Sequence, residues 1–183
     1  MGQPPPDRLR SMIISAVMAA LGLALPVAFH AVGLGSHFLP MLLPLLVNGF
    51  LVPLPWAVLT GAIVPLISSL ATGMPPMYPP VAAQMSLEGA VLGGVAAALY
   101  RSQPRRLWPA LLSAVVLCRL SGLTASWFLA RLFDLPAGFV SAAMLVRSLP
   151  GVALQIALVP LVVRQLERSR SILIKPHDSL PEA

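Results

Sequence analysis

Long apolar stretches separated by short polar segments most constrain what this chain can fold into. Of its 183 residues, 57% are hydrophobic and only 10% are charged, and the mean hydropathy is +0.86. A soluble domain carries about 25% charged residues. A transmembrane β-barrel would alternate apolar and polar residues over about ten positions, whereas these stretches are continuously apolar. The composition therefore predicts an all-α membrane protein with a single domain.

Six apolar stretches are candidate spans, which predicts a compact bundle of six transmembrane helices. They cover residues 11–31, 38–52, 56–70, 81–100, 108–133 and 138–163. The transmembrane domain is then 11–163, between an N-terminal tail (1–10) and a C-terminal tail (164–183). The second and third stretches are shorter than the roughly 20 residues that a bilayer requires, so a single merged span over 38–70 is the competing interpretation.

Two observations argue against the merged span. A helix over 38–70 would be about 50 Å long at 1.5 Å per residue, far more than the bilayer core requires. With six spans, the basic residues on the side of the N-terminus are Arg8, Arg10, Arg101, Arg105, Arg106, Arg164, Arg168, Arg170 and Lys175. The opposite side holds only Arg131, at the end of the fifth stretch, so the positive-inside rule assigns both termini to the cytoplasm. Membrane orientation thus accounts for the net charge of +6, and nucleic-acid binding is not expected.

A proline-dense segment, Thr-Gly-Met-Pro-Pro-Met-Tyr-Pro-Pro at residues 72–80, separates the third and fourth stretches. Lipid cannot solvate such a loop, so protein encloses it or it lies outside the bilayer. The charge distribution assigns it to the outer face, together with loops 32–37 and 134–137. Its prolines need no backbone donors and lose little entropy when they become ordered, which suits a rigid lid or rim.

Three charged side chains fall deep inside the predicted spans, away from their ends: Glu88, Arg119 and Arg147. Each costs at least about 2.5 kcal/mol if it faces lipid, and their depths allow all three to meet in the outer half of a bundle. One positive charge is then in excess. That excess suits a substrate with a carboxylate or phosphate, because arginine offers a bidentate fork to either group. The alternative is a Glu–Arg pair that only locks the bundle.

Uncharged polar side chains inside the spans extend this candidate site. Gln84 precedes Glu88 by one helical turn on the same face, and Asn48 and Gln155 lie in the second and sixth spans. These amides either hydrogen-bond a substrate or bridge neighbouring helices, and both interpretations stay open.

Near the predicted outer surface, His37, Met74 and Tyr78 complete the set of candidate substrate-binding residues. Methionine and tyrosine adapt to apolar ligand faces, although plain packing is the alternative for each methionine. His30 and His37 lack the further ligands that a zinc site needs, so neither a metal nor a cofactor is expected. The chain also has no phosphate-binding loop, and ATP hydrolysis would have to come from partner subunits.

The first span carries small residues at every fourth position. Ala16, Ala20 and Ala24 form a flat strip, which we call the Ala strip, where another helix can approach closely. The strip is interpreted either as a contact with a partner protein or as internal packing.

Four short segments carry a family resemblance: His-Phe-Leu-Pro-Met at 37–41, Pro-Leu-Ile-Ser-Ser at 65–69, Thr-Gly-Met-Pro-Pro at 72–76 and Met-Ser-Leu-Glu-Gly at 85–89. Over about 11–163 the chain resembles the substrate-binding S components of energy-coupling factor (ECF) vitamin transporters, in a branch with mostly unassigned substrates.

The resemblance implies a small six-helix protein of the bacterial cytoplasmic membrane that captures a vitamin or related micronutrient from outside. It also implies that the protein associates with a membrane T component and two ABC-type ATPases, and that the Ala strip meets the T component. Glu88, Arg119 and Arg147 match no substrate-assigned motif, so their binding role rests on burial and charge. The excess positive charge favours an anionic or amphoteric vitamin, such as pantothenate or a nicotinate-like acid.

Two other functions remain as alternatives. A membrane scaffold of envelope-building machinery would need the Ala strip but no small-molecule site. An intramembrane enzyme would have to use His30 or His37, but no facing nucleophile and base support that hypothesis.

Overall fold

The computed structural model describes residues 8–31, 33, 40–102, 106–134 and 142–173; within the last of these segments, side chains are described for 148–166 and 168. The described part is helical and contains no strand. Its helices are α1 (Arg8–Ala31), α3 (Leu42–Leu51), α4 (Leu54–Thr72), α5 (Val81–Ser102), α6 (Leu107–Leu132) and α7 (Ala142–Leu173). The predicted all-α class is confirmed.

The second predicted span is wrong in extent. Five of the described helices are long and apolar enough to cross a membrane, but α3 has only 10 residues, or about 15 Å. Its end has a local cause: Val52 precedes Pro53, a position that disfavours helical angles, and Val52 is extended with φ −121° and ψ 161°. Residues 38 and 39 of the predicted span lie outside the described residues.

The prediction that the second and third stretches form separate helices is confirmed, because α3 and α4 are joined by Val52 and Pro53. α4 covers 19 residues, longer than the predicted span 56–70, with a proline in its first turn where the missing N–H is unneeded. At the other end of the chain, α7 continues to Leu173, into the segment predicted to be a tail.

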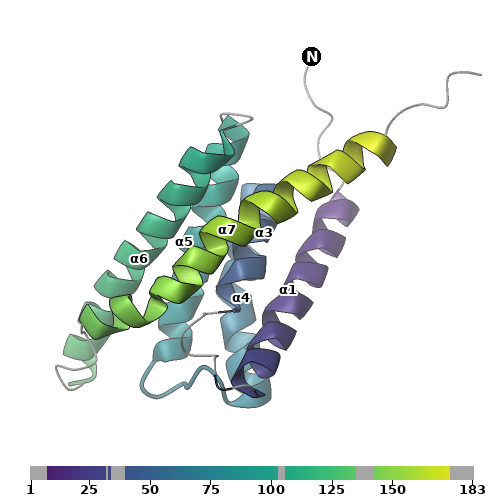
Figure 1. Cartoon of the computed structure of the whole chain (residues 1–183). Helices are drawn as coiled ribbons and strands as arrows, with labels where there is room; N and C mark the ends of the chain where they lie inside the picture. The colour runs from purple at the N-terminus through teal and green to yellow at the C-terminus, as the bar shows by residue number, and fades with distance from the viewer. Residues whose placement is uncertain (1–7, 32, 34–39, 103–105, 135–141, 174–183) are drawn as a thin grey trace, which may run out of the picture.

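The helices run alternately up and down (Figure 1). The beginning of α1, the end of α5, the beginning of α6 and the end of α7 lie at the upper end of that view. Basic residues mark this end: Arg8 opens α1, Arg101 lies in the last turn of α5, and Arg106 caps α6. The connection between α4 and α5 lies at the opposite end, where α6 also finishes, with Arg131 in its last turn.

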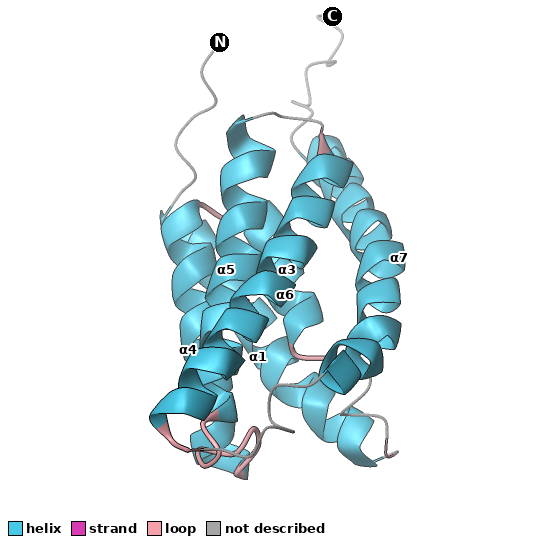
Figure 2. Cartoon of the chain, turned by 90° about the vertical axis from the view of Figure 1, so that its left-hand side faces the viewer, coloured by secondary structure: helices cyan, strands magenta, loops and turns pink. Residues whose placement is uncertain are grey.

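Helix α5 packs against α3, α4 and α6, and in Figure 2 it lies inside the group they form. Glycines allow this close approach. A Cβ built on Gly61 of α4 would overlap the backbone of Gly89 of α5, and one built on Gly49 of α3 would lie 2.6 Å from the carbonyl oxygen of Gly93. Small residues at such positions are typical of helix contacts inside membranes.

The apolar side chains divide into a buried core and an exposed outer surface. Leu42, Leu45 and Leu46 of α3 are almost fully buried, together with Leu92 of α5 and Leu111 of α6. Large apolar side chains remain exposed on the outside of every long helix. This outer surface is the one that a bilayer solvates, as expected of a membrane protein.

Candidate substrate site

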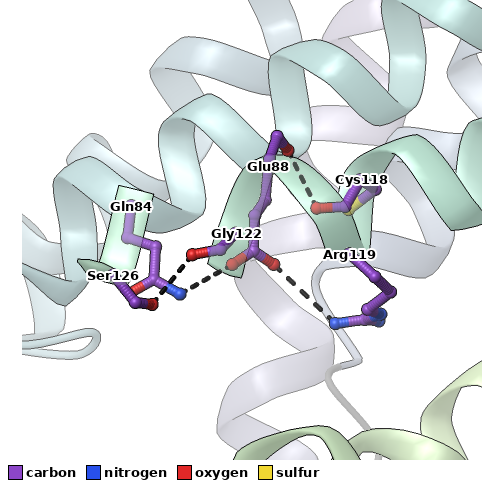
Figure 3. A network of polar contacts seen from close by, with 7 residues as sticks. Gln84, Glu88, Cys118, Arg119, Gly122 and Ser126 are labelled. Carbon is purple, nitrogen blue, oxygen red and sulfur yellow. Dashed lines mark hydrogen bonds and ion pairs between the residues drawn. The ribbon is translucent and has the colours of Figure 1, made fainter. Parts of the chain in front are cut away.

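Helix α5 turns two polar side chains toward α6 (Figure 3). Gln84 and Glu88 are four residues apart and therefore share one helical face. The Gln84 Nε2 atom donates a hydrogen bond of 2.8 Å to Oε1 of Glu88. Both side chains are buried, at 7% and 6% exposure. The predicted relation between these two residues is confirmed, and the carboxylate lies about 10 Å from the beginning of α5.

Helix α6 supplies the positive partner. Arg119 Nη1 lies 3.8 Å from Glu88 Oε2, an ion-pair distance that is too long for a hydrogen bond. Arg119 sits in the middle of α6, 12 residues from its beginning and 13 from its end (119 − 107 and 132 − 119). The structure thus brings together two of the three charged residues predicted to meet.

Gly122 determines how closely α6 approaches the carboxylate. A Cβ built on Gly122 would lie 2.7 Å from the carboxyl carbon of Glu88 and closer still to its Oε1 atom. Only glycine leaves the space that the Glu88 side chain occupies. The sequence prediction missed this residue; the available signal was a glycine three positions after an intramembrane arginine, on the same helical face.

Several buried polar atoms of this cluster have no hydrogen-bond partner. Among the described residues these are Nε and Nη2 of Arg119 and Oε1 of Gln84. The Gln84–Glu88–Arg119 cluster therefore offers two free donor nitrogens and one free acceptor oxygen that are shielded from solvent. Leaving such groups unpaired costs about 1–3 kcal/mol each, and more for charged groups. That cost is removed if a bound molecule completes the hydrogen bonds.

The other two predicted amide side chains, of Asn48 and Gln155, are also buried, but they lie on α3 and α7. Asn48, on α3, accepts a hydrogen bond of 3.4 Å from Ser15 Oγ of α1, and its Nδ2 has no partner among the described residues. Gln155 of α7 is 1% exposed, and neither of its amide atoms has a partner in that part of the chain. In the part of the chain that the structure describes, no hydrogen bond connects either residue to the Gln84–Glu88–Arg119 cluster.

The proline-dense loop is held to the end of α4 by its own hydrogen bonds. Ser68 Oγ donates to the Met74 carbonyl oxygen at 2.7 Å, and Thr72 Oγ1 lies 2.8 Å from the Ser68 carbonyl oxygen. Gly73 takes the left-handed conformation that ends the helix, with φ +72°. Met74 and Tyr78 are 54% and 70% exposed, so both predicted residues lie at a rim rather than in the interior.

The loop also reaches α6. The rings of Tyr78 and Phe133 meet edge to face, with centroids 6.5 Å apart. This contact links the loop between α4 and α5 to the residue that follows α6. The Tyr78–Phe133 contact lies at the end of the bundle where α5 begins. Glu88 lies about two helical turns further along α5.

Two predicted site residues lie outside the described part of the protein or its described side chains. His37 lies outside the described residues, and Arg147 falls in α7 where its side chain is not described. His30 is exposed, and its Nδ1 lies 2.7 Å from the Pro26 carbonyl oxygen of its own helix. In the described residues no group of three or more His, Cys, Asp and Glu side chains is arranged to hold a metal ion.

The Ala strip is exposed along its length: Ala16, Ala20 and Ala24 all face outward. The side of α1 that packs into the protein is roughly opposite and carries Ser11, Ser15 and Gly22. The strip is therefore a flat, outward-facing surface within the described part of the protein.

The fold and the buried polar cluster define a helical membrane protein with an unsatisfied polar site between its helices. The family described as ECF transporter, substrate-specific component, matches residues 10–163. The chain therefore belongs to the substrate-specific components of ECF transporters, which are substrate-binding transporter subunits and not enzymes. No curated protein and no solved structure matches the chain.

One prediction follows from the contact between Gly122 and Glu88. Gly122→Ala should lower the free energy of unfolding by about 1–3 kcal/mol, because the added methyl group displaces the carboxylate from its place beside α6. Denaturant unfolding in detergent micelles measures this change. As a control, Gly122→Ala is also made in the Glu88→Ala variant, where it should leave the free energy of unfolding almost unchanged. Equal destabilisation in both backgrounds would show that Gly122 does not accommodate Glu88.

Proposed function

We propose that this chain is the substrate-capture subunit of an ATP-driven ECF importer and binds a small water-soluble vitamin or related micronutrient. The observation that carries the proposal is the buried Gln84–Glu88–Arg119 cluster, with its unpaired donors and acceptor. An intramembrane ion pair that only locked the helices would be expected to satisfy its own hydrogen bonds. Unfilled hydrogen-bonding capacity instead favours a site that a ligand completes, and the family membership points to the same class of function.

The chain is further proposed to cross the bacterial cytoplasmic membrane six times, with both termini in the cytoplasm. The alternating helix directions and the basic residues at one end support this orientation. Substrate would enter at the opposite end, where the loop between α4 and α5 and the Tyr78–Phe133 contact form a lid or rim.

The proposal retains four additional substrate contacts: Asn48, Gln155, Arg147 and His37. The first two have buried, unpaired amide atoms, which supports a role for each. Arg147 would add the positive charge that favours an anionic substituent on the substrate.

The proposed partners are a membrane T component and two ABC-type ATPases, with the Ala strip as the contact with the T component. Ala20→Trp should then reduce substrate uptake at least about tenfold, because a bulky side chain in a close helix contact costs about 1–3 kcal/mol. Binding by the isolated chain should be unchanged. Uptake in cells that express all subunits, together with binding in detergent, measures both effects.

The control for this prediction is Leu21→Trp, which is also exposed on α1, at 43%, but lies beside the Ala strip. It should leave uptake near the wild-type level. If both variants reduce uptake equally, the Ala strip has no special role and the effect reflects general disturbance of α1.

The proposed function is tested with the isolated chain, purified without any partner subunit. The expected result is one small polar molecule per chain, released on denaturation and identified by mass spectrometry. A membrane scaffold would carry no such molecule. If the purified chain holds none, and no vitamin from a panel that includes pantothenate, nicotinate and riboflavin raises its unfolding temperature, the proposed function is wrong.

A further inference from the structure

We propose that the exposed side of α6 is a lipid-contact surface, and that Trp108 and Trp127 mark the two membrane–water interfaces along it. Its partner is phospholipid: acyl chains between the two tryptophans and headgroups beyond them. The inference goes beyond the proposed function, because it holds whether or not the polar cluster binds a vitamin.

One side of α6 has no helix packed against it in the described part of the protein. There α6 contacts α5 and α7, and it lies on the outside of the bundle (Figure 2). The side that packs inward carries Ala114, Cys118 and Gly122. The remaining surface carries large apolar side chains that are between 44% and 55% exposed: Leu112, Val116, Leu117 and Leu120.

The two tryptophans of α6 are separated by the thickness of one bilayer core. Trp108 is 46% exposed and Trp127 is 56% exposed. They are 19 residues apart (127 − 108), or about 28 Å at 1.5 Å per residue, and the hydrocarbon core is about 30 Å thick. Tryptophan is enriched at both membrane–water interfaces, where its apolar ring and its polar N–H are both satisfied.

The surface between the two tryptophans offers lipid no unpaired polar group. Arg119 is the only charged residue in this interval, and its side chain is 17% exposed and paired with Glu88. Thr124 is the one exposed polar residue there, and its Oγ1 donates a hydrogen bond of 2.9 Å to the Leu120 carbonyl oxygen of its own helix. Acyl chains can therefore solvate the whole surface.

Positive charge begins directly beyond each tryptophan. Arg106 is exposed and precedes Trp108 by two residues. Arg131 is exposed, and its guanidinium carbon lies 5.6 Å from the ring centre of Trp127. A guanidinium at this level reaches headgroup phosphates, which it binds well. The order charge, tryptophan, apolar surface, tryptophan, charge repeats the layers of a bilayer, whereas a protein partner would not require this spacing.

These interfaces also determine the depth of the Glu88–Arg119 ion pair. Arg119 is 11 residues from Trp108 and 8 residues from Trp127 (119 − 108 and 127 − 119), or about 16 Å and about 12 Å along α6. The ion pair therefore lies near the middle of the bilayer. A molecule that enters from the Trp127 end has to travel well below the headgroups to reach it.

The test measures the depth of single tryptophans by fluorescence quenching. The full chain is placed in phosphatidylcholine vesicles whose acyl chains carry bromine either close to the headgroup or close to the chain end. Trp56→Phe/Trp127→Phe retains only Trp108, and Trp56→Phe/Trp108→Phe retains only Trp127. In each variant, bromine close to the headgroup should quench the fluorescence at least about twofold more strongly than bromine close to the chain end.

The matched control places a tryptophan midway between the two interfaces. Leu117 is 44% exposed and lies 9 residues after Trp108 and 10 before Trp127 (117 − 108 and 127 − 117). Leu117→Trp is made in a chain whose three native tryptophans are phenylalanine. It should show the reverse order, with stronger quenching by bromine close to the chain end.

Three results would overturn the inference. The first is stronger quenching of Trp108 or Trp127 by the deeper bromine, or the same order at position 117 as at the interfaces. The second is the absence of quenching in all these variants, which would mean that α6 does not face lipid. The third is loss of quenching at position 117 when the chain is copurified with the other transporter subunits, because a protein partner would then cover this surface. None of these readouts depends on a bound vitamin, so failure of the proposed function is a separate result.

Discussion

Arg119→Met should lower the free energy of unfolding by about 3–5 kcal/mol, because it leaves the buried Glu88 carboxylate without its positive partner. Methionine fills much of the space of the arginine side chain, so the loss arises mainly from the uncompensated charge. Denaturant unfolding of the purified protein in detergent micelles measures the change.

A second substitution tests this explanation. Glu88→Leu combined with Arg119→Met should recover most of the lost stability, since apolar replacement of a whole buried ion pair is often neutral. The matched control is Arg131→Met on the same helix, which removes an arginine lying 5.6 Å from the Trp127 ring centre. It should cost only about 0.5–1 kcal/mol. If Arg119→Met is no more harmful than Arg131→Met, the ion pair is not a buried interaction.

Gly61→Ala should have the next largest effect, because the new methyl group would overlap the backbone of Gly89 and force α4 away from α5. Overpacking of this kind costs about 1–3 kcal/mol and occasionally more, and backbone cannot move aside as a side chain can. The expected result is a free energy of unfolding lowered by at least about 3 kcal/mol, with little folded protein recovered from membranes.

The control for the glycine contact is Gly94→Ala on α5. Its Cβ would lie 2.9 Å from Cγ2 of Val58, a side chain that is 37% exposed and has room to move. This variant should lose no more than about 1 kcal/mol, near the lower limit for overpacking. Comparable losses in the two variants would mean that α4 and α5 are not held together through direct backbone contact.

Relations within one helix could be predicted from the sequence, whereas relations between helices could not. The contact of Gln84 with Glu88 follows from their four-residue spacing, which the geometry of an α-helix brings onto one face. The pairing of Glu88 with Arg119 was expected from the cost of a lone charge in a membrane. The space that Gly122 leaves for Glu88 depends on the rotation and depth of α6 against α5, which no pattern along the chain specifies.

The same distinction applies to the fold. Continuous apolar stretches predicted the helices and their order, because a bilayer permits few other structures. Hydropathy placed the end of the second span one residue too far, at Val52, because it does not register the extended conformation that Pro53 imposes there. It also included residues 40 and 41, which form a turn before α3 begins at Leu42. The partner of Asn48 was also missed, since Ser15 comes from a helix distant in the sequence. The inward face of α1 is apolar or small throughout, so the exposure of the Ala strip could not be decided from spacing alone.

The central claim is that the buried cluster between α5 and α6 holds a small polar molecule. The most direct test is the amount of copurified molecule, measured by mass spectrometry, in the wild-type chain and in the Glu88→Leu/Arg119→Met variant. The account predicts about one molecule per wild-type chain and at least about a tenfold lower amount in the folded double variant, in which the charged hydrogen-bonding groups of Glu88 and Arg119 are gone. Equal amounts in both proteins would contradict it and would show that the cluster only holds the helices together.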